Sequence, residues 1–394
     1  MMLGQRASFW VAAAVVAHTI WTSAAPAMTY PLYAVEWGLN TTQTAAIFAI
    51  YPIVVVGMLI CFGDISDYIG RRTTMLLGLA ASFLGVMLFA VAPDLLWIYI
   101  GRGFMGIGVG LSAGPATAAM IEFSAAGQAK KASAITTVAQ SAGLALATLI
   151  GGALIEYAPL PTRLNFWLLL VIIALIFGAA WFLPRHTSAE AKGRWRPKTP
   201  AIPRELLPVF ISSAAAVSSA YAIGALGLSL GAQIARDLIG SGNVLLNGAT
   251  LAVFAFSSGA TGLVAKGLAS RPAITLGVVA SASGMGLLAW SVAEHSLAIF
   301  MAFLMMAGMA YCLMFMGGLG LINMYAPTHH RGGTLSALYL VAYLVQGGFA
   351  LTLGSVAAHW SLATAIDAGA VVILLVSLFG VFSVLLGART RALA

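Results

Sequence analysis

Long apolar runs alternate with short polar turns along nearly the whole sequence. A helix needs roughly 20 apolar residues to cross the hydrocarbon of a bilayer, and twelve runs come close to or exceed that length. They cover residues 8–33, 43–63, 73–92, 95–121, 133–157, 164–183, 205–231, 244–268, 272–293, 295–324, 333–358 and 361–387. The pattern predicts twelve transmembrane helices. The first run is too long for the apolar core of a signal peptide, so we expect it to be retained.

Composition agrees with this pattern. Hydrophobic residues make up 61% of the 394 residues and charged residues only 8%, whereas an ordinary soluble domain is about 45–50% apolar and about 25% charged. A water-soluble fold of this size could not bury so much apolar surface. We therefore expect an all-α membrane protein. Both cysteines, Cys61 and Cys312, lie inside apolar runs, so no disulfide framework is expected.

The longest polar stretch, "PRHTSAEAKGRWRPKTPAIPRE", separates six runs from six. It is rich in Pro, Lys and Arg and has no periodic apolar face, which is typical of a linker. The sequence therefore predicts an N-terminal six-helix bundle over residues 1–184, a cytoplasmic linker over 185–204 and a C-terminal six-helix bundle over 205–394.

The Lys and Arg residues alternate between the two sides of the predicted helices. Sixteen of the 19 fall at the N-terminus, in the even-to-odd turns, in the linker or at the C-terminus, while the opposite turns hold Arg163 and Arg236 and one predicted span holds Arg102. Cytoplasmic turns are enriched in Lys and Arg, so both termini are predicted to be cytoplasmic in a multi-pass protein of the cell inner (plasma) membrane. The net charge of +8 thus reports topology, and no nucleic-acid partner is expected.

The densest charge lies in the turn between the second and third runs, "FGDISDYIGRRTTM". Its pattern resembles the loop signature of the major facilitator superfamily, G-x-L-x-D-x-x-G-R-R, through Gly63, Asp67, Gly70, Arg71 and Arg72. The two glycines allow the backbone to turn tightly between helices. The resemblance implies a fold of two pseudo-symmetric six-helix bundles and secondary transport by alternating access.

A degraded copy of this signature, "GLVAKGLASRP", stands at the matching place in the second half. Gly262 and Arg271 align with the first-half glycine and arginine at a constant offset of 199, whereas Lys266 replaces the aspartate. A duplicated two-bundle transporter leaves this kind of trace.

In that family, the resemblance implies, the first-half loop is a cytoplasmic gate that latches the two halves. Asp67 is expected to face the start of the eleventh span, near residues 332–334, because helix N-termini attract carboxylates. Arg71 is expected to pair with Glu122 at the end of the fourth span. The alternative is a solvated loop whose arginines only set topology.

The fourth run contains "GRGFMGIGVGLSAGP", which resembles the family's R-x-x-x-G-x-G segment. Arg102, Gly106, Gly110 and Gly114 recur every four residues and share one helix face, and such small residues admit a closely packed neighbour. A charge inside a span costs about 2.5–3.5 kcal/mol on insertion scales and is functional by default. The resemblance to antiporters implies that Arg102 acts in proton coupling or substrate binding. Alternatively, this arginine snorkels to the outer interface.

The fifth run carries three glycines, Gly143, Gly151 and Gly152, in "GLALATLIGGALIEYAP". They fit the frame of a motif associated with antiporters of the superfamily, G-x-x-x-G-P-x-x-G-G, but Ala147 and Thr148 replace its central Gly-Pro. A role in antiport and a role in close helix packing both remain open.

The first span and its exit, "AAPAMTYPLYAVEWGLNTTQTAAIFAIYP", resemble the first two helices of proton-coupled drug and metabolite exporters. Pro26 and Pro31 are expected to break or bend the first helix near its outer end.

Several polar residues within the runs are candidates for proton coupling or a substrate cavity. His18 is the one intramembrane side chain that ordinarily titrates near neutrality, although a hydrogen bond to a neighbouring helix would also explain it. Asp367 either carries a proton or pairs with a cation near the outer surface. The cavity candidates are Thr22, Gln140, Asn247, Tyr339, Tyr343 and Gln346, the last three of which share a helix face.

The chemistry of these candidates limits the function. No carboxylate lies at mid-depth in the first six runs, which favours a neutral or anionic substrate over a lipophilic cation. The linker lacks G-x-x-x-x-G-K-[ST], so no ATP-driven engine is present.

A membrane-embedded enzyme would need a catalytic constellation, and a sensor would usually append a soluble domain; neither is found. We therefore predict a monomeric, non-enzymatic transporter without cofactor or metal. It would exchange protons for a small organic compound in efflux. Proton-coupled uptake by symport is the alternative.

Overall fold

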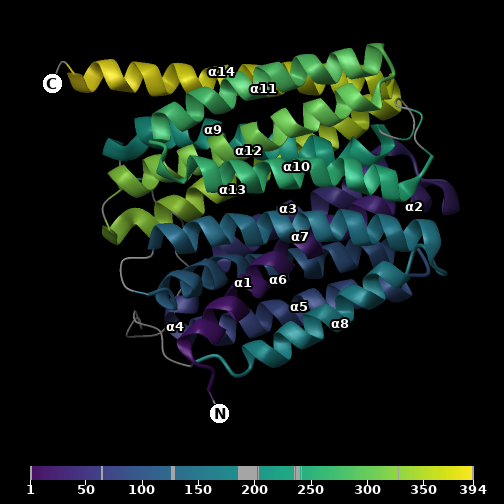
Figure 1. Cartoon of the computed structure of the whole chain (residues 1–394), viewed down its shortest axis with the longest axis horizontal. Coiled ribbons are helices and arrows are strands. Elements are labelled where there is room, and N and C mark those ends of the chain that lie inside the picture. The colour runs from purple at the N-terminus through teal and green to yellow at the C-terminus, as the bar shows by residue number, and fades with distance from the viewer. Residues whose placement is uncertain are drawn as a thin grey trace. The chain divides into compact units, whose positions relative to one another are not determined.

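A computed structural model describes residues 2–63, 65–125, 129–184, 202, 204–234, 236, 240, 242–326 and 328–392, and every regular element among them is a helix (Figure 1). For residues 129–131, 133, 134, 232, 328–333, 336 and 384–392 the description is confined to the backbone. The predicted linker, residues 185–204, lies outside the described residues except for positions 202 and 204.

The first part of the chain forms α1 (Gln5–Ala24), η1 (Ala25–Met28), α2 (Tyr30–Glu36), α3 (Thr41–Phe62), α4 (Ser66–Ile69), α5 (Arg71–Val91), α6 (Leu95–Glu122), α7 (Ala129–Tyr157) and α8 (Leu164–Ala180). The second part forms η2 (Arg204–Leu206), α9 (Leu207–Gln233), α10 (Val244–Val264), η4 (Ala265–Gly267), α11 (Ser270–Ala293), α12 (Leu297–Tyr325), α13 (Thr328–His359) and α14 (Leu362–Ala392).

Each of the twelve predicted runs lies on a helix or a series of helices. Among the described residues, 11 of these segments are long and apolar enough to cross a membrane, and α8 is a shorter apolar helix of 17 residues. At 1.5 Å per residue α8 is about 26 Å long, which is close to the roughly 30 Å of bilayer hydrocarbon. The predicted all-helical membrane fold is confirmed.

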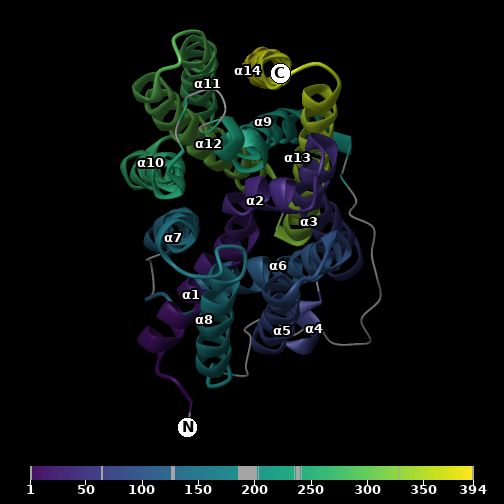
Figure 2. The ribbon, with the colours of Figure 1, turned by 90° about the vertical axis from the view of Figure 1, so that its right-hand side faces the viewer.

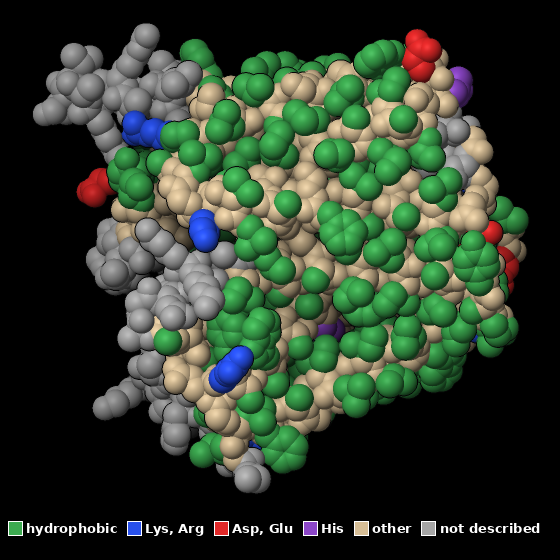
Figure 3. Space-filling model, in the orientation of Figure 1, with side chains coloured by type: hydrophobic (Ala, Val, Ile, Leu, Met, Phe, Trp, Pro, Cys, Tyr) green, Lys and Arg blue, Asp and Glu red, His purple; other side chains and the backbone are tan. Residues whose placement is uncertain are grey.

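The outward faces of the helices fit a lipid solvent. Large apolar side chains are exposed along α8 and α14, among them Val171, Leu175, Leu375, Phe379 and Phe382. In Figure 3 hydrophobic side chains cover most of the visible face, whereas prominent Lys and Arg side chains lie toward its left. Exposed apolar surface on this scale indicates a membrane environment.

The first predicted span is broken where the sequence predicts it. α1 ends at Ala24, Pro26 stands in the first turn of η1, and Pro31 stands in the first turn of α2. Proline has no N–H and its ring clashes with the carbonyl four residues earlier, which favours an interruption of the helix at these two positions. Carbonyl groups at the break therefore need other donors.

Contacts between residues divide the chain into two compact units. Unit 1 contains residues 1–39, 50–198 and 243–252, and unit 2 contains residues 40–49, 199–242 and 253–394. The beginning of α3 therefore belongs to unit 2, and the beginning of α10 belongs to unit 1.

Neighbouring helices within unit 1 approach closely through small residues. In Figures 1 and 2, α5 lies beside α6. A Cβ atom added at Gly85 of α5 would lie 2.7 Å from the carbonyl oxygen of Gly101 on α6. Gly78 contacts Ser112 and Gly108 contacts Ser82 in the same interface. Only small side chains allow backbones to pack at this distance.

Unit 2 repeats this arrangement in α11 and α12. Gly277, Ser281 and Gly284 of α11 follow Gly78, Ser82 and Gly85 at the same offset of 199 that relates the two loop signatures. A Cβ atom at Gly277 would lie 2.6 Å from the Met314 side chain of α12. The internal repeat thus extends from the loop into the helix that follows it.

Candidate functional site

The signature loop contains a short helix that the sequence analysis missed. The predicted turn includes α4, a single helical turn over Ser66–Ile69, before Gly70 ends it and α5 begins. Gly70 has φ 87° and ψ 145°, a conformation that residues with a Cβ rarely adopt. Gly63, which directly follows the last residue of α3, is exposed.

The predicted pair of Arg71 and Glu122 is present. Arg71 Nη2 lies 2.8 Å from Glu122 Oε1, and the two side chains are 16% and 21% exposed. The contact joins the start of α5 to the end of α6. Partial burial reduces solvent screening, so this ion pair holds the loop on α6 more firmly than a fully exposed pair would.

Arg72 has a different partner. Its guanidinium carbon lies 5.6 Å from the centroid of the Trp181 ring, directly after the end of α8. This is a cation–π distance. The two arginines of the loop therefore bind two different helix ends within unit 1.

Asp67 lies in α4 and is half-buried. Its predicted partners are residues 332–334 at the start of α13. The structure describes only the backbone of residues 332 and 333, and Thr334 is buried. The latch between Asp67 and the start of α13 stays a prediction.

Arg102 is fully buried, with 0% of its side chain exposed. Its Nη1 donates a hydrogen bond to the carbonyl oxygen of Ser23 at 3.0 Å, and its guanidinium carbon lies 4.9 Å from the Tyr51 ring centroid. Asn165 Nδ2 donates to the carbonyl of Ala25 at 3.2 Å. Side chains of α6 and α8 thus satisfy carbonyls at the proline break of the first span. The snorkelling alternative does not fit a side chain without exposed surface.

Two of the three glycines that follow Arg102 pack as predicted. Cβ atoms at Gly106 and Gly110 would lie 2.9 Å from the carbonyl oxygen of Tyr51 and 2.6 Å from Met58 Cβ on α3. The prediction is wrong for Gly114, because no described atom lies within 4 Å of the position of its Cβ. One helical turn beyond the level of Met58, α3 reaches its last residue, Phe62.

The fifth-span glycines pack closely within unit 1. Gly143 contacts the backbone of Ala17 in α1, and a Cβ atom at Gly152 would lie 2.8 Å from the Val244 carbonyl oxygen in α10. The Cβ of Gly151 would be 3.4 Å from Asn165 Nδ2. Close packing therefore explains Gly143 and Gly152, whereas 3.4 Å at Gly151 is an ordinary contact distance that does not require a glycine.

Thr148, which replaces the proline of the antiporter motif, also lies in a packed position. Its hydroxyl donates back to the carbonyls of Leu144 and Ala145, each at 3.2 Å, and its backbone contacts Gly248 of α10. Such back-bonding often bends a helix slightly. The substitution keeps α7 continuous from Ala129 to Tyr157.

His18 and Thr22 place unsatisfied polar atoms in the interior of unit 1. His18 is 1% exposed, and its Nδ1 lies 3.1 Å from the carbonyl oxygen of Val15. Neither His18 Nε2 nor Thr22 Oγ1 has a hydrogen-bond partner among the described residues. The nearby Trp21 Nε1 and Tyr30 hydroxyl share this property. Buried polar atoms without partners are costly and call for an explanation.

The remaining unit 1 candidates are more dispersed. Gln140 on α7 is half-buried, and Asn247 on the first turn of α10 is buried. In unit 2, Asp367 on α14 is exposed. Both alternatives for Asp367, proton carrier and partner of a cation near the outer surface, stay predictions.

Tyr339 and Tyr343 belong to a larger group of rings, here called the aromatic cluster. It consists of Tyr221 on α9, Phe254 on α10, Tyr311 and Phe315 on α12, and Tyr339 and Tyr343 on α13. Ring centroids lie 5.0 Å apart for Tyr221 and Tyr343, 5.5 Å for Phe254 and Tyr311, and 5.9 Å for Tyr311 and Phe315. All lie within unit 2.

The aromatic cluster is only partly closed. Tyr221 is buried, whereas the other five rings are partly exposed. One turn beyond Tyr343, Gln346 is buried and its Oε1 has no hydrogen-bond partner among the described residues. The sequence analysis missed Tyr221, Phe254, Tyr311 and Phe315. The spacing of Tyr311 and Phe315, four residues apart on one helix face, was the available signal.

The sequence matches the profile of the Major Facilitator Superfamily over residues 10–344. The chain belongs to the Major Facilitator Superfamily. This is a family of membrane transporters that bind small molecules, and not a family of enzymes.

Solved structures share the Major Facilitator fold over nearly the whole chain. A POT family transporter in complex with 5-aminolevulinic acid superposes with a TM-score of 0.75 at 13% identity, covering 95% of each chain. A bacterial homologue of the human lysosomal transporter Spinster, in an inward-facing and unoccupied conformation, gives 0.68 at 14% identity over 98% of this chain and 97% of that one. At these identities the likeness shows the fold alone.

Two curated relatives match part of this Major Facilitator chain. The multidrug efflux pump LfrA of Mycolicibacterium smegmatis is 31% identical over 154 residues, which are 38% of this chain and 30% of that protein. The puromycin resistance protein pur8 of Streptomyces alboniger is 29% identical over 124 residues, 31% of this chain and 24% of that protein. The chain thus spans less than a third of either relative.

Proposed function

We propose that this transporter exports a small organic compound in exchange for protons, by alternating access, as a monomer in a bacterial inner membrane with both termini cytoplasmic. The observation that carries the proposal is the buried polar face of the first span, where His18 Nε2 and Thr22 Oγ1 have no partner among the described residues. Export is favoured because the two curated relatives are named an efflux pump and a resistance protein.

His18 is the best candidate for the proton carrier. An arginine stays protonated under all physiological conditions, so Arg102 does not release a proton, and its hydrogen bond to Ser23 gives it a positioning role. Asp367 is exposed. A histidine changes charge between pH 5 and 8 in many proteins, and His18 has one ring nitrogen available for this exchange.

The aromatic cluster is the proposed substrate-binding surface of unit 2. Partly exposed rings offer stacking and edge contacts to an apolar or aromatic group, and the Oε1 atom of Gln346 accepts a hydrogen bond from a polar substituent. None of the cluster residues is charged. These properties favour a compound with an apolar or aromatic group, and the lack of a carboxylate at mid-depth in the first six runs supports a neutral or anionic one.

The signature loop is the proposed cytoplasmic gate. Gly63 and Gly70 shape the turn, and Arg71 and Arg72 anchor it on Glu122 and Trp181. Asp67, on the half-buried α4, is the proposed carboxylate of the latch. The anchors keep α4 in place, so the carboxylate that forms the latch is positioned before the gate closes.

The test uses purified protein in liposomes that contain a trapped pH-sensitive dye, with neutral amphiphiles, organic anions and lipophilic cations as substrates. Protons that move against an added compound establish antiport and identify the substrate class. Protons that move with the compound support proton-coupled uptake instead. Exchange of a labelled compound without any proton movement would rule out proton coupling.

A further inference from the structure

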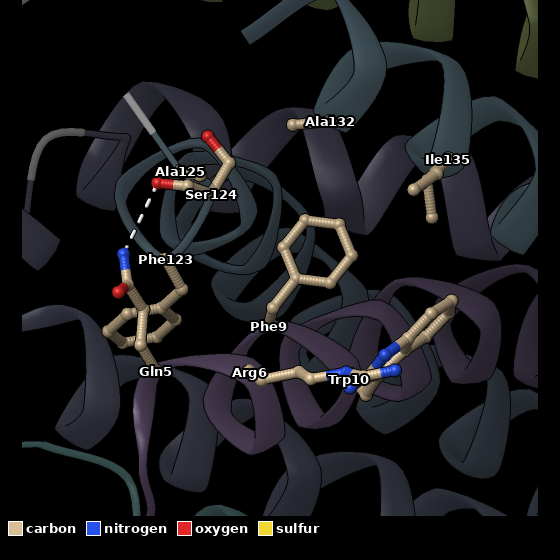
Figure 4. A pocket seen from close by; sticks show the side chains of 9 residues that line it. All are labelled: Gln5, Arg6, Phe9, Trp10, Phe123, Ser124, Ala125, Ala132 and Ile135. Carbon is tan, nitrogen blue, oxygen red and sulfur yellow. Dashed lines mark hydrogen bonds between the residues drawn. The ribbon is translucent and has the colours of Figure 1, made fainter. Parts of the chain in front are cut away.

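A pocket of about 370 Å³ lies at the beginning of α1 and includes Phe123 and Ser124, which directly follow α6. Figure 4 shows Phe9 in its middle, with Gln5 and Ser124 on one side and Trp10 and Ile135 on the other. The first turns of α1, the connection after α6 and the beginning of α7 form its walls, all within unit 1.

Arg6 and Gln5 are the long polar side chains that α1 contributes to the pocket, and Figure 4 shows them extending to opposite sides of it. Arg6 is exposed in the first turn of α1, and Gln5 Nε2 donates a hydrogen bond to the carbonyl of Ser124 at 3.3 Å. No Asp or Glu occurs among the described lining residues. Arg6 therefore attracts an anion on the Trp10 side of the pocket.

Much of the remaining lining of the pocket is apolar. The rings of Phe9 and Trp10 meet edge to face with centroids 5.5 Å apart, and Ile135 lies on the α7 side. Trp10 is 56% exposed. An exposed tryptophan one turn beyond an arginine at the end of a span is typical of the membrane–water interface.

Arg71 and Arg72 lie at the same end of unit 1 as this pocket. Glu122, the partner of Arg71, directly precedes the pocket residues Phe123 and Ser124. The backbone N–H of Leu3, just before α1, donates to the carbonyl of Phe182. Phe182 directly follows Trp181, whose ring Arg72 contacts. Basic residues near a span attract the anionic headgroups of a leaflet.

We propose that this pocket binds an anionic phospholipid. The phosphate binds Arg6, and the first part of one acyl chain lies along Phe9, Trp10 and Ile135. A volume of about 370 Å³ holds a headgroup and the adjoining part of a chain, while the rest of the lipid stays in the bilayer. The bound lipid bridges α1 and the α6–α7 connection. The proposal is independent of the direction and coupling of transport.

The experiment is native mass spectrometry of the purified full chain, titrated with phosphatidylglycerol or with phosphatidylcholine. The protein is expected to retain phosphatidylglycerol preferentially, and Arg6→Gln is expected to weaken that retention about tenfold, as for the loss of one charge-assisted contact. Arg6→Lys keeps the charge and is expected to keep most of the binding. Ile135→Glu places a second negative charge beside the chain and is expected to weaken it as well.

Lys266→Gln is the matched control, since it removes one exposed charge from unit 2. Equal loss of lipid from Arg6→Gln and Lys266→Gln would overturn the proposal, because it would show general surface attraction. Equal retention of phosphatidylglycerol and phosphatidylcholine by the unmodified chain would also overturn the proposal. Displacement of the lipid by millimolar glycerol phosphate would show a simple anion site, which also contradicts it. Size-exclusion profiles verify that each variant is folded.

Discussion

Arg102 of α6 donates a hydrogen bond to the carbonyl of Ser23 in α1 across 3.0 Å of protein interior. The acceptor lies at the end of α1, just before the proline-containing turn that ends the regular helix. A buried charge in a membrane protein is expensive, and here the Arg102 guanidinium is hydrogen-bonded to a backbone carbonyl beside the break. Structure and function therefore make overlapping demands on this arginine.

Replacement of Arg102 should lower stability as well as transport. Arg102→Gln removes the cation and shortens the side chain, so the Ser23 carbonyl is left buried without its donor; we expect a loss of about 2 kcal/mol in the free energy of unfolding. Thermal unfolding in detergent measures the effect. Arg102→Lys should recover part of it. Unchanged thermal stability together with lost transport would assign Arg102 a purely functional role.

Gly106 and Gly114 should respond oppositely to the same substitution. Gly106→Ala places a methyl group 2.9 Å from the Tyr51 carbonyl oxygen and should destabilise the protein by about 1–3 kcal/mol. Gly114→Ala meets no described atom within 4 Å and should be neutral or stabilise the helix by up to about 1 kcal/mol. The two midpoints of thermal unfolding, measured side by side, test the packing of α6 on α3.

His18→Gln should uncouple transport from protons. Glutamine retains an N–H donor for the Val15 carbonyl but does not titrate, so substrate exchange should continue while substrate-driven proton movement stops. Labelled-substrate counterflow and the trapped pH dye report these two activities separately.

Thr22→Ser is the control for His18→Gln, since it keeps a hydroxyl on the same helix face and should keep coupling. If His18→Gln couples protons as the unmodified chain does, the proton carrier is a different residue.

Tyr311→Ala should weaken substrate binding. The Tyr311 ring contacts Tyr221, Phe254 and Phe315, and an aromatic contact contributes about 0.5–1.5 kcal/mol, so KM should rise by up to about tenfold. Tyr311→Phe keeps the ring and should have a KM near that of the unmodified chain.

Phe382→Ala serves as the control for Tyr311→Ala because its side chain is exposed on α14, outside the aromatic cluster. An equal rise in KM for both alanine variants would contradict a role of the cluster in substrate binding.

Asp67→Asn should leave folding intact and impair transport, because a neutral side chain binds the start of a helix less strongly than a carboxylate. Expression, monodispersity and thermal unfolding establish the folded state, and initial rates in liposomes give the effect. Glu36→Gln, at the exposed end of α2, is the control. Normal transport by well-folded Asp67→Asn protein would remove the latch from the mechanism.

Features that depend on local chemistry were predictable from the sequence. The apolar runs identified the helices, Pro26 and Pro31 located the break in the first span, and the loop motif led to the pair of Arg71 and Glu122. In each case the cause lies within a few residues or in a spacing typical of the family.

Features that depend on the meeting of distant helices were not predictable. The aromatic cluster joins rings from residues 221 to 343 on four helices, so no window of sequence contains it. Gly114 continues the four-residue spacing of Arg102, Gly106 and Gly110, but α3 ends at Phe62 and does not extend far enough to pack against it. Asp367 occupies an apolar span, yet its exposure depends on which face α14 turns outward.

The glycine and serine positions shared by α5 and α11 also bear on how the two halves diverged. Gly78, Ser82 and Gly85 recur as Gly277, Ser281 and Gly284, while the aspartate of the preceding loop has become Lys266. After an ancestral gene duplication, a larger side chain at one of these steric contacts would disrupt a whole helix pair. The loop tolerated reversal of its charge. The second copy was therefore free to evolve a different loop chemistry as long as it kept the contacts between its backbones.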